Sequence, residues 1–161
     1  MTLRRFCGID PGLTGGIAII LVEDDPFLQM VKVRPMPIAG KDLDLTALAE
    51  LLSSKDPTIA VVENVHAMPG QGVTSMFKFG FVTGAVHGVL ATLGIPRYLV
   101  SPQQWKKVIL AGTLKDKQSA IDYCSRIFPS VSLLATPRSK KAHSGMADSL
   151  CLAEYCRIMY G

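Results

Sequence analysis

Short apolar runs dominate the first hundred residues, and several of them have the length of β-strands. Residues 5–10, 16–23 and 28–36 are three such runs. Turn-forming residues separate them, so they predict three consecutive strands in an antiparallel meander. Residues 58–63 form a nearly unbroken β-branched run, which is typical of a buried central strand. Residues 95–100 predict a fifth strand.

Apolar residues recur at helical spacing in five other segments. These segments are residues 43–52, 74–93, 103–110, 116–128 and 144–159. Ser101 and Pro102 supply an N-cap and a first-turn proline for the third of these helices. Three strands are followed by helices that alternate with two further strands. This order predicts an α/β fold with a mixed five-stranded sheet flanked by helices.

Three glycines, Gly80, Gly84 and Gly88, recur every four residues along the longest predicted helix. Residues four apart lie on one helical face, so this face carries a stripe without side chains. Glycine costs a helix ~1 kcal/mol relative to alanine. The stripe therefore indicates that the backbone packs very closely against the sheet or against a partner.

Length and composition favour one folded domain over residues 1–161. Hydrophobic residues make up 48% of the chain and charged residues 19%, as in ordinary globular proteins rather than disordered ones. The four cysteines form no CxxC pair, which argues against a zinc site or a disulfide scaffold. No signal peptide or membrane segment is evident, so we expect a cytoplasmic protein without a membrane partner.

Positive charge is concentrated in one third of the chain. The net charge is only +4, but residues 97–141 contain nine basic and two acidic residues. Such a segment is typical of a face that binds a polyanion, and an ordinary solvated surface can have the same composition.

Three carboxylates stand at the ends of predicted elements. Asp10 and Glu63 each end a buried strand, and Asp148 lies near the start of the last helix among small residues. If all three meet at one edge, their repulsion must be relieved by a cation such as Mg²⁺ or Mn²⁺. Such a site is suited to phosphodiester hydrolysis. Ordinary structural roles remain open: Asp10 as a turn cap, Glu63 in an arginine pair and Asp148 as a solvent-facing residue.

The segments around these carboxylates resemble the active-site segments of RuvC-type Holliday-junction resolvases. The resemblance spans almost the whole chain, and it is closest to the chloroplast resolvase and its bacterial and phage relatives. The matching segments are GIDPGLTGG at 8–16, VVEN at 61–64, HAMPGQG at 66–72, VSP at 100–102, WKK at 105–107 and ADSL at 147–150. Lys117, at the head of a helix that ends in Phe128 and Pro129, also matches.

This resemblance implies an RNase H-like nuclease domain and a homodimer. It also implies Mg²⁺-dependent symmetric nicking of four-way DNA junctions in recombination and repair, with Mn²⁺ as a substitute. Carried over by position, Asp10, Glu63 and Asp148 are the expected metal ligands and catalytic residues. Many family members have a second Asp three residues before the last one, where this chain has Gly145. His143 is the candidate for that missing catalytic role, and it must then precede the helix.

DNA contacts are expected from basic residues and from one loop. Gln71 is the candidate for sequence preference, because its glycine-containing loop follows the Glu63 strand and an amide can read base edges. Trp105 can stack on the nucleic acid or anchor its own helix. Among Met76, Phe77, Phe79 and Phe81, one can wedge against a base, and two are expected in the core. The basic candidates are Lys78, Lys106, Lys107, Lys115, Lys117, Arg138, Lys140 and Lys141.

Two other functions stay open. The chain can be another RNase H-like nuclease that cuts RNA/DNA hybrids or structured RNA, or a junction-binding module without catalysis. Length argues against an ATPase of the actin and sugar-kinase type, because its site lies between two such domains and this chain supplies one. From the resemblance we expect a bacterial or phage-encoded protein associated with the nucleoid.

Overall fold

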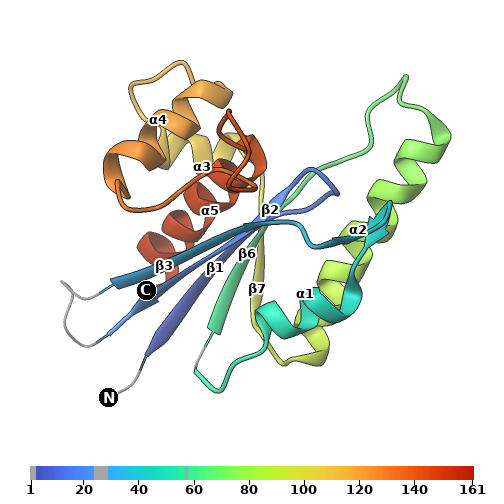
Figure 1. The fold of residues 1–161 in the computed structure, drawn as a ribbon, viewed down its shortest axis with the longest axis horizontal. Coiled ribbons are helices and arrows are strands. Elements are labelled where there is room, and N and C mark those ends of the chain that lie inside the picture. Colours follow the sequence, from blue (N-terminus) through green and yellow to red (C-terminus); the bar gives the residue numbers. More distant parts are fainter. Residues whose placement is uncertain (1–2, 24–28, 57) are drawn as a thin grey trace.

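A five-stranded mixed sheet forms the centre of the molecule, as seen in the computed structural model, which describes residues 3–23, 29–56 and 58–161 (Figure 1). The strand order is β3-β2-β1-β6-β7. β1 pairs antiparallel with β2 and parallel with β6, β2 pairs antiparallel with β3, and β6 pairs parallel with β7. The strands are β1 (Arg4–Asp10), β2 (Gly16–Val22), β3 (Gln29–Pro35), β6 (Thr58–Glu63) and β7 (Arg97–Val100). The predicted α/β class and mixed sheet are confirmed, although residue 28 of the predicted third strand lies outside the described residues.

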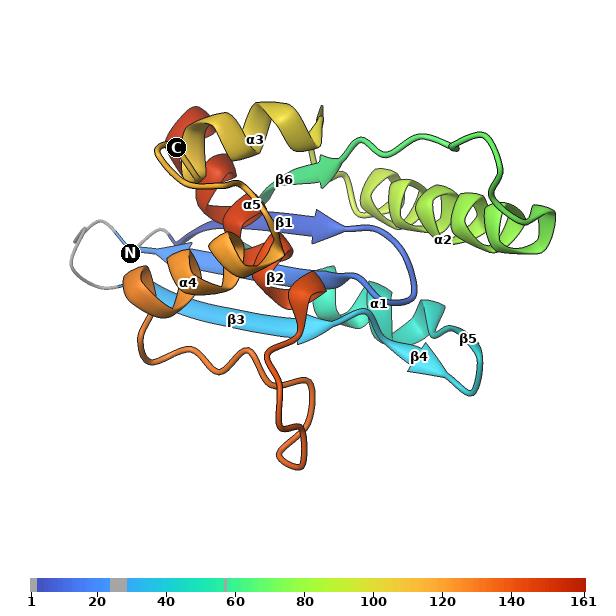
Figure 2. The same cartoon turned by 90° about the horizontal axis from the view of Figure 1, so that it is seen from above.

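Five helices cover the two faces of this sheet in the described part of the chain (Figures 1 and 2). On one face lie α3, α4 and α5, and on the other lie α1 and α2. Their bounds are α1 (Leu45–Leu52), α2 (Val73–Thr92), α3 (Pro102–Ile109), α4 (Lys117–Ile127) and α5 (Ser144–Tyr160). The predicted helices agree with these bounds to within one or two residues. The first begins later than predicted, because Asp44 caps it by accepting a hydrogen bond from the Ala47 amide.

A small hairpin was not predicted. It consists of β4 (Ile38–Ala39) and β5 (Asp42–Leu43), which pair antiparallel around Gly40, whose φ is +66°. Two-residue strands are too short to show the alternation that identifies a strand in a sequence. The hairpin lies beside α2, and the Lys78 ammonium of that helix is 3.9 Å from the Asp42 carboxylate.

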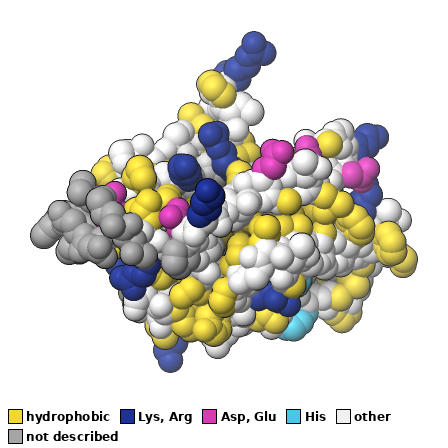
Figure 3. Space-filling model, turned by 90° about the horizontal axis from the view of Figure 1, so that it is seen from below, with side chains coloured by type: hydrophobic (Ala, Val, Ile, Leu, Met, Phe, Trp, Pro, Cys, Tyr) yellow, Lys and Arg dark blue, Asp and Glu magenta, His cyan; other side chains and the backbone are white. Residues whose placement is uncertain are grey.

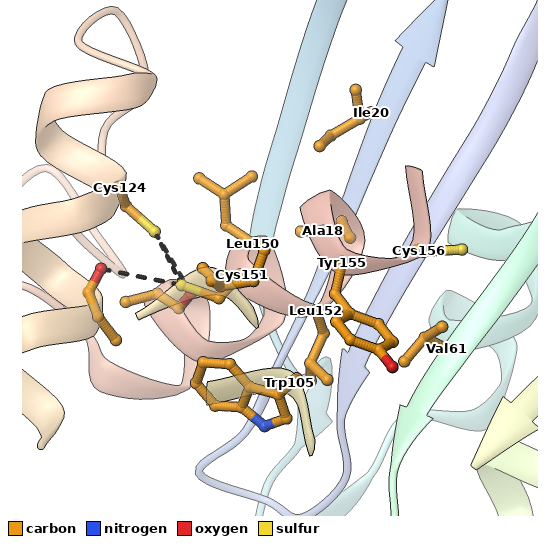
Figure 4. Close-up of a cluster of buried hydrophobic side chains, with 14 of the residues drawn as sticks. Ala18, Ile20, Val61, Trp105, Cys124, Leu150, Cys151, Leu152, Tyr155 and Cys156 are labelled. Atoms are coloured by element: carbon orange, nitrogen blue, oxygen red, sulfur yellow. Dashed lines mark hydrogen bonds between the residues drawn. The ribbon is translucent and has the colours of Figure 1, made fainter. Parts of the chain in front are cut away.

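The alternation of side chains along β1 divides the core in two. Phe6 faces α5 and belongs to the larger apolar cluster, whereas Cys7 and Ile9 belong to the cluster on the α2 side. Figure 4 shows part of the larger cluster, including Trp105 and Leu152. All four cysteines are buried free thiols, as expected without a zinc site or a disulfide scaffold.

Glycines let α5 lie directly on the sheet. A Cβ at Gly8 would collide with backbone atoms of Ser149 and Ala153, and a Cβ at Gly16 would crowd the backbone of Gly145. The absence of side chains at these positions brings the helix backbone against β1 and β2. This close packing fixes where the first turns of α5 stand relative to the ends of the strands.

The glycine stripe of α2 does not pack against the sheet, which corrects one of the two expectations for it. Apart from the helix's own neighbouring backbone, no described atom lies within 4 Å of the position a Cβ would take at Gly80, Gly84 or Gly88. The opposite face of α2 packs against the sheet, and its buried residues are Val82, Val86 and Leu90. The stripe lines a groove of about 590 Å³ between α1 and α2.

The surface around this groove is apolar. Phe77 and Phe81 are 77% and 53% exposed, and Figure 3 shows apolar side chains gathered over α1 and α2 at the right. No residue of the predicted aromatic and Met76 group is fully buried, so the expectation of two core residues among them is wrong. By length and composition alone, α2 is long and apolar enough to cross a membrane, although no membrane segment was expected from the sequence. Its packing on the sheet is that of a helix in a folded α/β domain.

Candidate active site

Asp10 and Glu63 lie side by side at one end of the sheet. β1 and β6 are parallel neighbours, and Ile9 pairs with Val62. Asp10 and Glu63 are the next residues of the two strands, so they stand beside each other. Both strands end there, so both carboxylates leave the sheet at its C-terminal edge. Phe6 and Val61 belong to the cluster on the α5 face, and alternation puts Asp10 and Glu63 on that same face.

Asp148 comes to this edge from α5. It is the fifth residue of the helix, whose first turn packs on the turn between β1 and β2. A Cβ at Gly145 would collide with the carbonyl oxygen of Thr14 and with the backbone of Gly15. Glycine is therefore required at 145, and a fourth carboxylate at this position does not fit the packing.

Electrostatic repulsion connects the three carboxylates. Burial, followed by the charges of Glu63 and Asp148, raises the pKa of Asp10 from 3.8 to about 8, against the opposing charge of Lys117. Burial and the charge of Glu63 raise the pKa of Asp148 to about 6, against the opposing charges of Lys106 and Lys117. The acids are thus close enough to disfavour one another's charged forms. Solvent-facing carboxylates would not behave in this way, which excludes that alternative for Asp148.

Glu63 is held by a tryptophan rather than by the arginine considered in the sequence analysis. The Trp105 indole Nε1–H donates a 2.8 Å hydrogen bond to Glu63 Oε1, and both side chains are buried. Trp105 is 0% exposed, so the prediction that it contacts DNA is wrong, and its alternative role as an anchor is the one observed. Trp105 and Ile109 are the buried residues of α3. Their four-residue spacing was the sequence signal for this role.

The three carboxylates do not form a ready-made ligand cluster. Within residues 3–23, 29–56 and 58–161, no group of three or more His, Cys, Asp or Glu side chains is gathered closely enough to hold a metal ion. The donors are nevertheless hard carboxylate oxygens, and a cation would relieve the repulsion that raises the pKa of Asp10 and Asp148. The chemistry of the donor set therefore fits Mg²⁺, although the three side chains are not gathered around one point.

His143 precedes the helix, as its predicted role requires. It is the N-cap of α5, and its Nδ1 accepts a 3.1 Å hydrogen bond from the Met146 amide. A neutral imidazole that accepts at Nδ1 carries its proton on Nε2. The ring can then donate a hydrogen bond from Nε2, whereas binding a metal there would require the cap to be given up.

The basic candidates for DNA contacts lie in several parts of the structure. Lys106 and Lys117 lie near the carboxylates, since their charges lower the pKa of Asp148. Lys107 is exposed on α3, and Lys115 is exposed in the loop before α4, with a φ of 59°. Lys140 and Lys141 are exposed in the connection from α4 to α5, and Lys78 lies apart from these on α2.

Gln71 is exposed in the loop between β6 and α2, as expected. Its side-chain Oε1 accepts a 3.1 Å hydrogen bond from the Met68 amide, so the amide group closes its own loop. The NH₂ group of the side chain keeps its two donors. A cavity of about 860 Å³ along β3 is lined by other residues, and none of the three carboxylates contributes to it.

Comparisons with known proteins support the fold. No family model matches the chain, and no curated protein matches it. Among solved structures, T. thermophilus RuvC in complex with Holliday junction substrate matches with a TM-score of 0.60 and 19% identity, over 99% of this chain and 97% of that one. Fowlpox virus resolvase in complex with substrate Holliday junction DNA matches with a TM-score of 0.53 and 13% identity, over 95% of this chain and 99% of that one. The expected RNase H-like fold of RuvC is therefore confirmed.

Proposed function

We propose that this chain is a Holliday-junction resolvase, a hydrolase that makes symmetric metal-dependent nicks in four-way DNA junctions during recombination and repair. The observation that carries the proposal is the meeting of Asp10, Glu63 and Asp148 at one end of a sheet with the fold of RuvC. The two similar structures contain Holliday junction DNA, which supports a four-way junction as the substrate. Residues 1–161 would form a single nuclease domain.

The three carboxylates would hold Mg²⁺, or Mn²⁺ in its place. Bound there, the cation would activate a water molecule and stabilise the oxygen that leaves when the phosphodiester bond is cut. Trp105 has a positioning role, because its hydrogen bond fixes one oxygen of Glu63 and leaves the other available. Lys117 and Lys106 place positive charge beside the acids, where a phosphate of the scissile strand would lie.

His143 would act on the substrate as a hydrogen-bond donor. Its Nδ1 is engaged by the Met146 amide, so the Nε2–H group is the one free to donate to a phosphate oxygen. The role is different from that of the carboxylate it replaces, since it adds no negative charge to the site. DNA contacts would come from Gln71, from the partly buried Lys106 and from the exposed lysines, which are Lys78, Lys107, Lys115, Lys117, Lys140 and Lys141.

A homodimer would place two such sites on opposing strands, and the exposed face of α2 supports it. Large residues, Val73, Phe77 and Phe81, occupy the N-terminal half of this face. Gly84 and Gly88 occupy the C-terminal half, with open space where side chains would stand. When two copies of α2 pack antiparallel about a two-fold axis, the large half of each helix meets the small half of the other.

A nicking experiment tests the proposed function. The purified protein is incubated with Mg²⁺ and a mobile four-way DNA junction, a linear duplex or an RNA/DNA hybrid, with Asp10→Asn as the control. We expect paired symmetric nicks only in the junction, and none with the variant. Preferential cutting of the hybrid would instead identify the RNase H-type nuclease. Tight junction binding without nicks would identify a binding module. The expected cytoplasmic, nucleoid-associated location in bacteria or phage-infected cells is part of the same proposal.

A further inference from the structure

The connection between α4 and α5 is an ordered projection rather than a loose linker. Figure 2 shows it extending past β3, the edge strand, before it returns to the start of α5. The His143 amide donates a 2.8 Å hydrogen bond to the Leu133 carbonyl oxygen, which closes the base of the projection. Leu133 is buried in the larger core cluster, and Ala135 and Ala142 pack against it. We call residues 133–143 the arm.

The tip of the arm is a preformed turn. The Ser139 amide donates a 3.0 Å hydrogen bond to the Thr136 carbonyl oxygen, and the Thr136 amide donates a 3.1 Å hydrogen bond to Ser139 Oγ. The two hydroxyl oxygens are 3.0 Å apart. Pro137 stands at the second position of this turn, where its fixed φ is favoured. Both ends of the turn are thus tied together before any ligand binds.

Every charged side chain of the arm is basic. Arg138, Lys140 and Lys141 are exposed at its tip, and no Asp or Glu occurs from residue 123 to residue 147. Among the ion pairs within the described residues, none involves these three side chains. Three positive charges on four consecutive residues repel one another unless anions lie between them, and the chain supplies none nearby in sequence. A phosphodiester backbone provides such a row of anions.

The base of the arm is also part of the candidate active site. His143 closes the arm through its amide and caps α5 through its ring, five residues before Asp148. DNA held by the arm is therefore held in a fixed relation to the carboxylates. The arm itself projects beside β3, whereas Lys106 belongs to α3 and Lys117 begins α4.

We infer that the arm grips the phosphate backbone of a duplex arm of the junction, away from the bond that is cut, with Arg138 as its principal contact. This inference rests on the proposed function and adds to it a second anchoring surface, whose principal residue is Arg138. A preordered arm loses little conformational entropy when it binds, so its contacts would contribute directly to affinity. The three cations at its tip act in binding and not in the chemical step.

The test compares two charge-matched double variants. Arg138→Ser with Lys140→Ser neutralises the arm, and Arg4→Ser with Lys55→Ser removes one exposed Arg and one exposed Lys at the opposite end of the sheet. Binding of a fluorescent four-way junction is measured by anisotropy in EDTA at several NaCl concentrations. Each lost phosphate contact lowers the slope of log K against log salt by ~0.9, so the arm variant should lose about 2 from the slope. The control variant should keep the wild-type slope.

Nicking with Mg²⁺ by the wild-type protein and by the control variant separates this inference from the proposed function, and we expect both proteins to nick the junction at the same rate. We expect Arg138→Lys to recover most of the affinity that the arm variant loses. A wild-type slope in the arm variant would overturn the inference while leaving the resolvase intact. A control variant that loses as much of the slope as the arm variant would also overturn it, since the loss would then follow net charge rather than the arm. A wild-type protein that neither prefers junctions nor nicks them would instead refute the proposed function.

Discussion

Replacing Asp10 with Asn should stabilise the metal-free protein even though it removes a proposed catalytic residue. Asp10 is partly buried beside Glu63 and Asp148, and its pKa is raised to about 8. At neutral pH the folded state must therefore keep Asp10 largely protonated, whereas in the unfolded chain the same carboxyl group loses its proton freely. Asparagine has nearly the same shape and no charge.

The raised pKa sets the size of this effect. Each pKa unit corresponds to ~1.36 kcal/mol. At pH 7 the interval between the ordinary pKa of 3.8 and the solution pH is just over three units, so the stabilisation by Asn has an upper limit of about 4 kcal/mol. Local water and side-chain rearrangement reduce the gain to about 2 to 3 kcal/mol. For a chain of this length, that corresponds to a rise of roughly 4 to 12 °C in Tm.

The sign of the pH dependence follows from the same shift. An acid whose pKa is higher in the folded state costs nothing below its unfolded pKa, because it is protonated in both states. The cost grows as the pH rises through 3.8 and levels off above about 8. The Tm difference between Asp10→Asn and wild type should therefore be small near pH 4 and largest above pH 8.

Thermal unfolding in EDTA at pH 4, 6, 7.5 and 9 measures this difference. Asp122→Asn is the matched control, since Asp122 is exposed on α4 and accepts a hydrogen bond from the Gln118 side chain. Adding Mg²⁺ should narrow the gap by stabilising the wild type alone. The reasoning is refuted if Asp10→Asn unfolds at or below the wild-type temperature at pH 7.5 and 9 in EDTA.

Substitutions at three further positions test the packing of α5, the candidate site and the dimer. Gly145→Asp should lower Tm without increasing nicking, because its Cβ collides with the Thr14 carbonyl; increased nicking would mean that a fourth carboxylate fits. Trp105→Phe removes the hydrogen bond to Glu63, so half-maximal nicking should require several-fold more Mg²⁺, and an unchanged Mg²⁺ titration would remove Trp105 from the site. Gly84→Ala should raise helix stability by up to ~1 kcal/mol, whereas Gly84→Leu should yield monomers in light scattering after size exclusion. A Gly84→Leu protein that remains dimeric would place the dimer interface elsewhere. Binding of the wild-type protein to lipid vesicles would instead indicate that the exposed apolar face of α2 contacts a membrane.

The sheet could be predicted because its strands carry strong local signals. The β-branched run that ends at Glu63 and the strand that ends at Asp10 both predict buried strands with a terminal carboxylate. Parallel pairing of β1 and β6 then brings those two ends together. The hairpin β4-β5 could not be predicted in the same way, because its pairing extends over two residues in each strand.

Residues whose role depends on distant partners were harder to predict. Trp105 lies between polar and basic neighbours in the sequence, and only the folded chain shows that its indole reaches Glu63, 42 residues away. The glycine stripe of α2 presented the same problem. A glycine indicates that something approaches the backbone, but the sequence does not tell whether the chain itself or a partner does so.

The fold forces together charges that would otherwise separate. Gly8, Gly16 and Gly145 allow α5 to lie against β1 and β2. This contact fixes Asp148 beside the strand ends despite the electrostatic repulsion among the three carboxylates. The hydrogen bond from Trp105 similarly retains Glu63 among apolar neighbours. Backbone packing and a buried indole thus keep the acids in place when no cation is present. A site maintained in this way at the open edge of a sheet is suited to a large charged polymer, which would bring its own phosphates to the cations of α3, α4 and the arm.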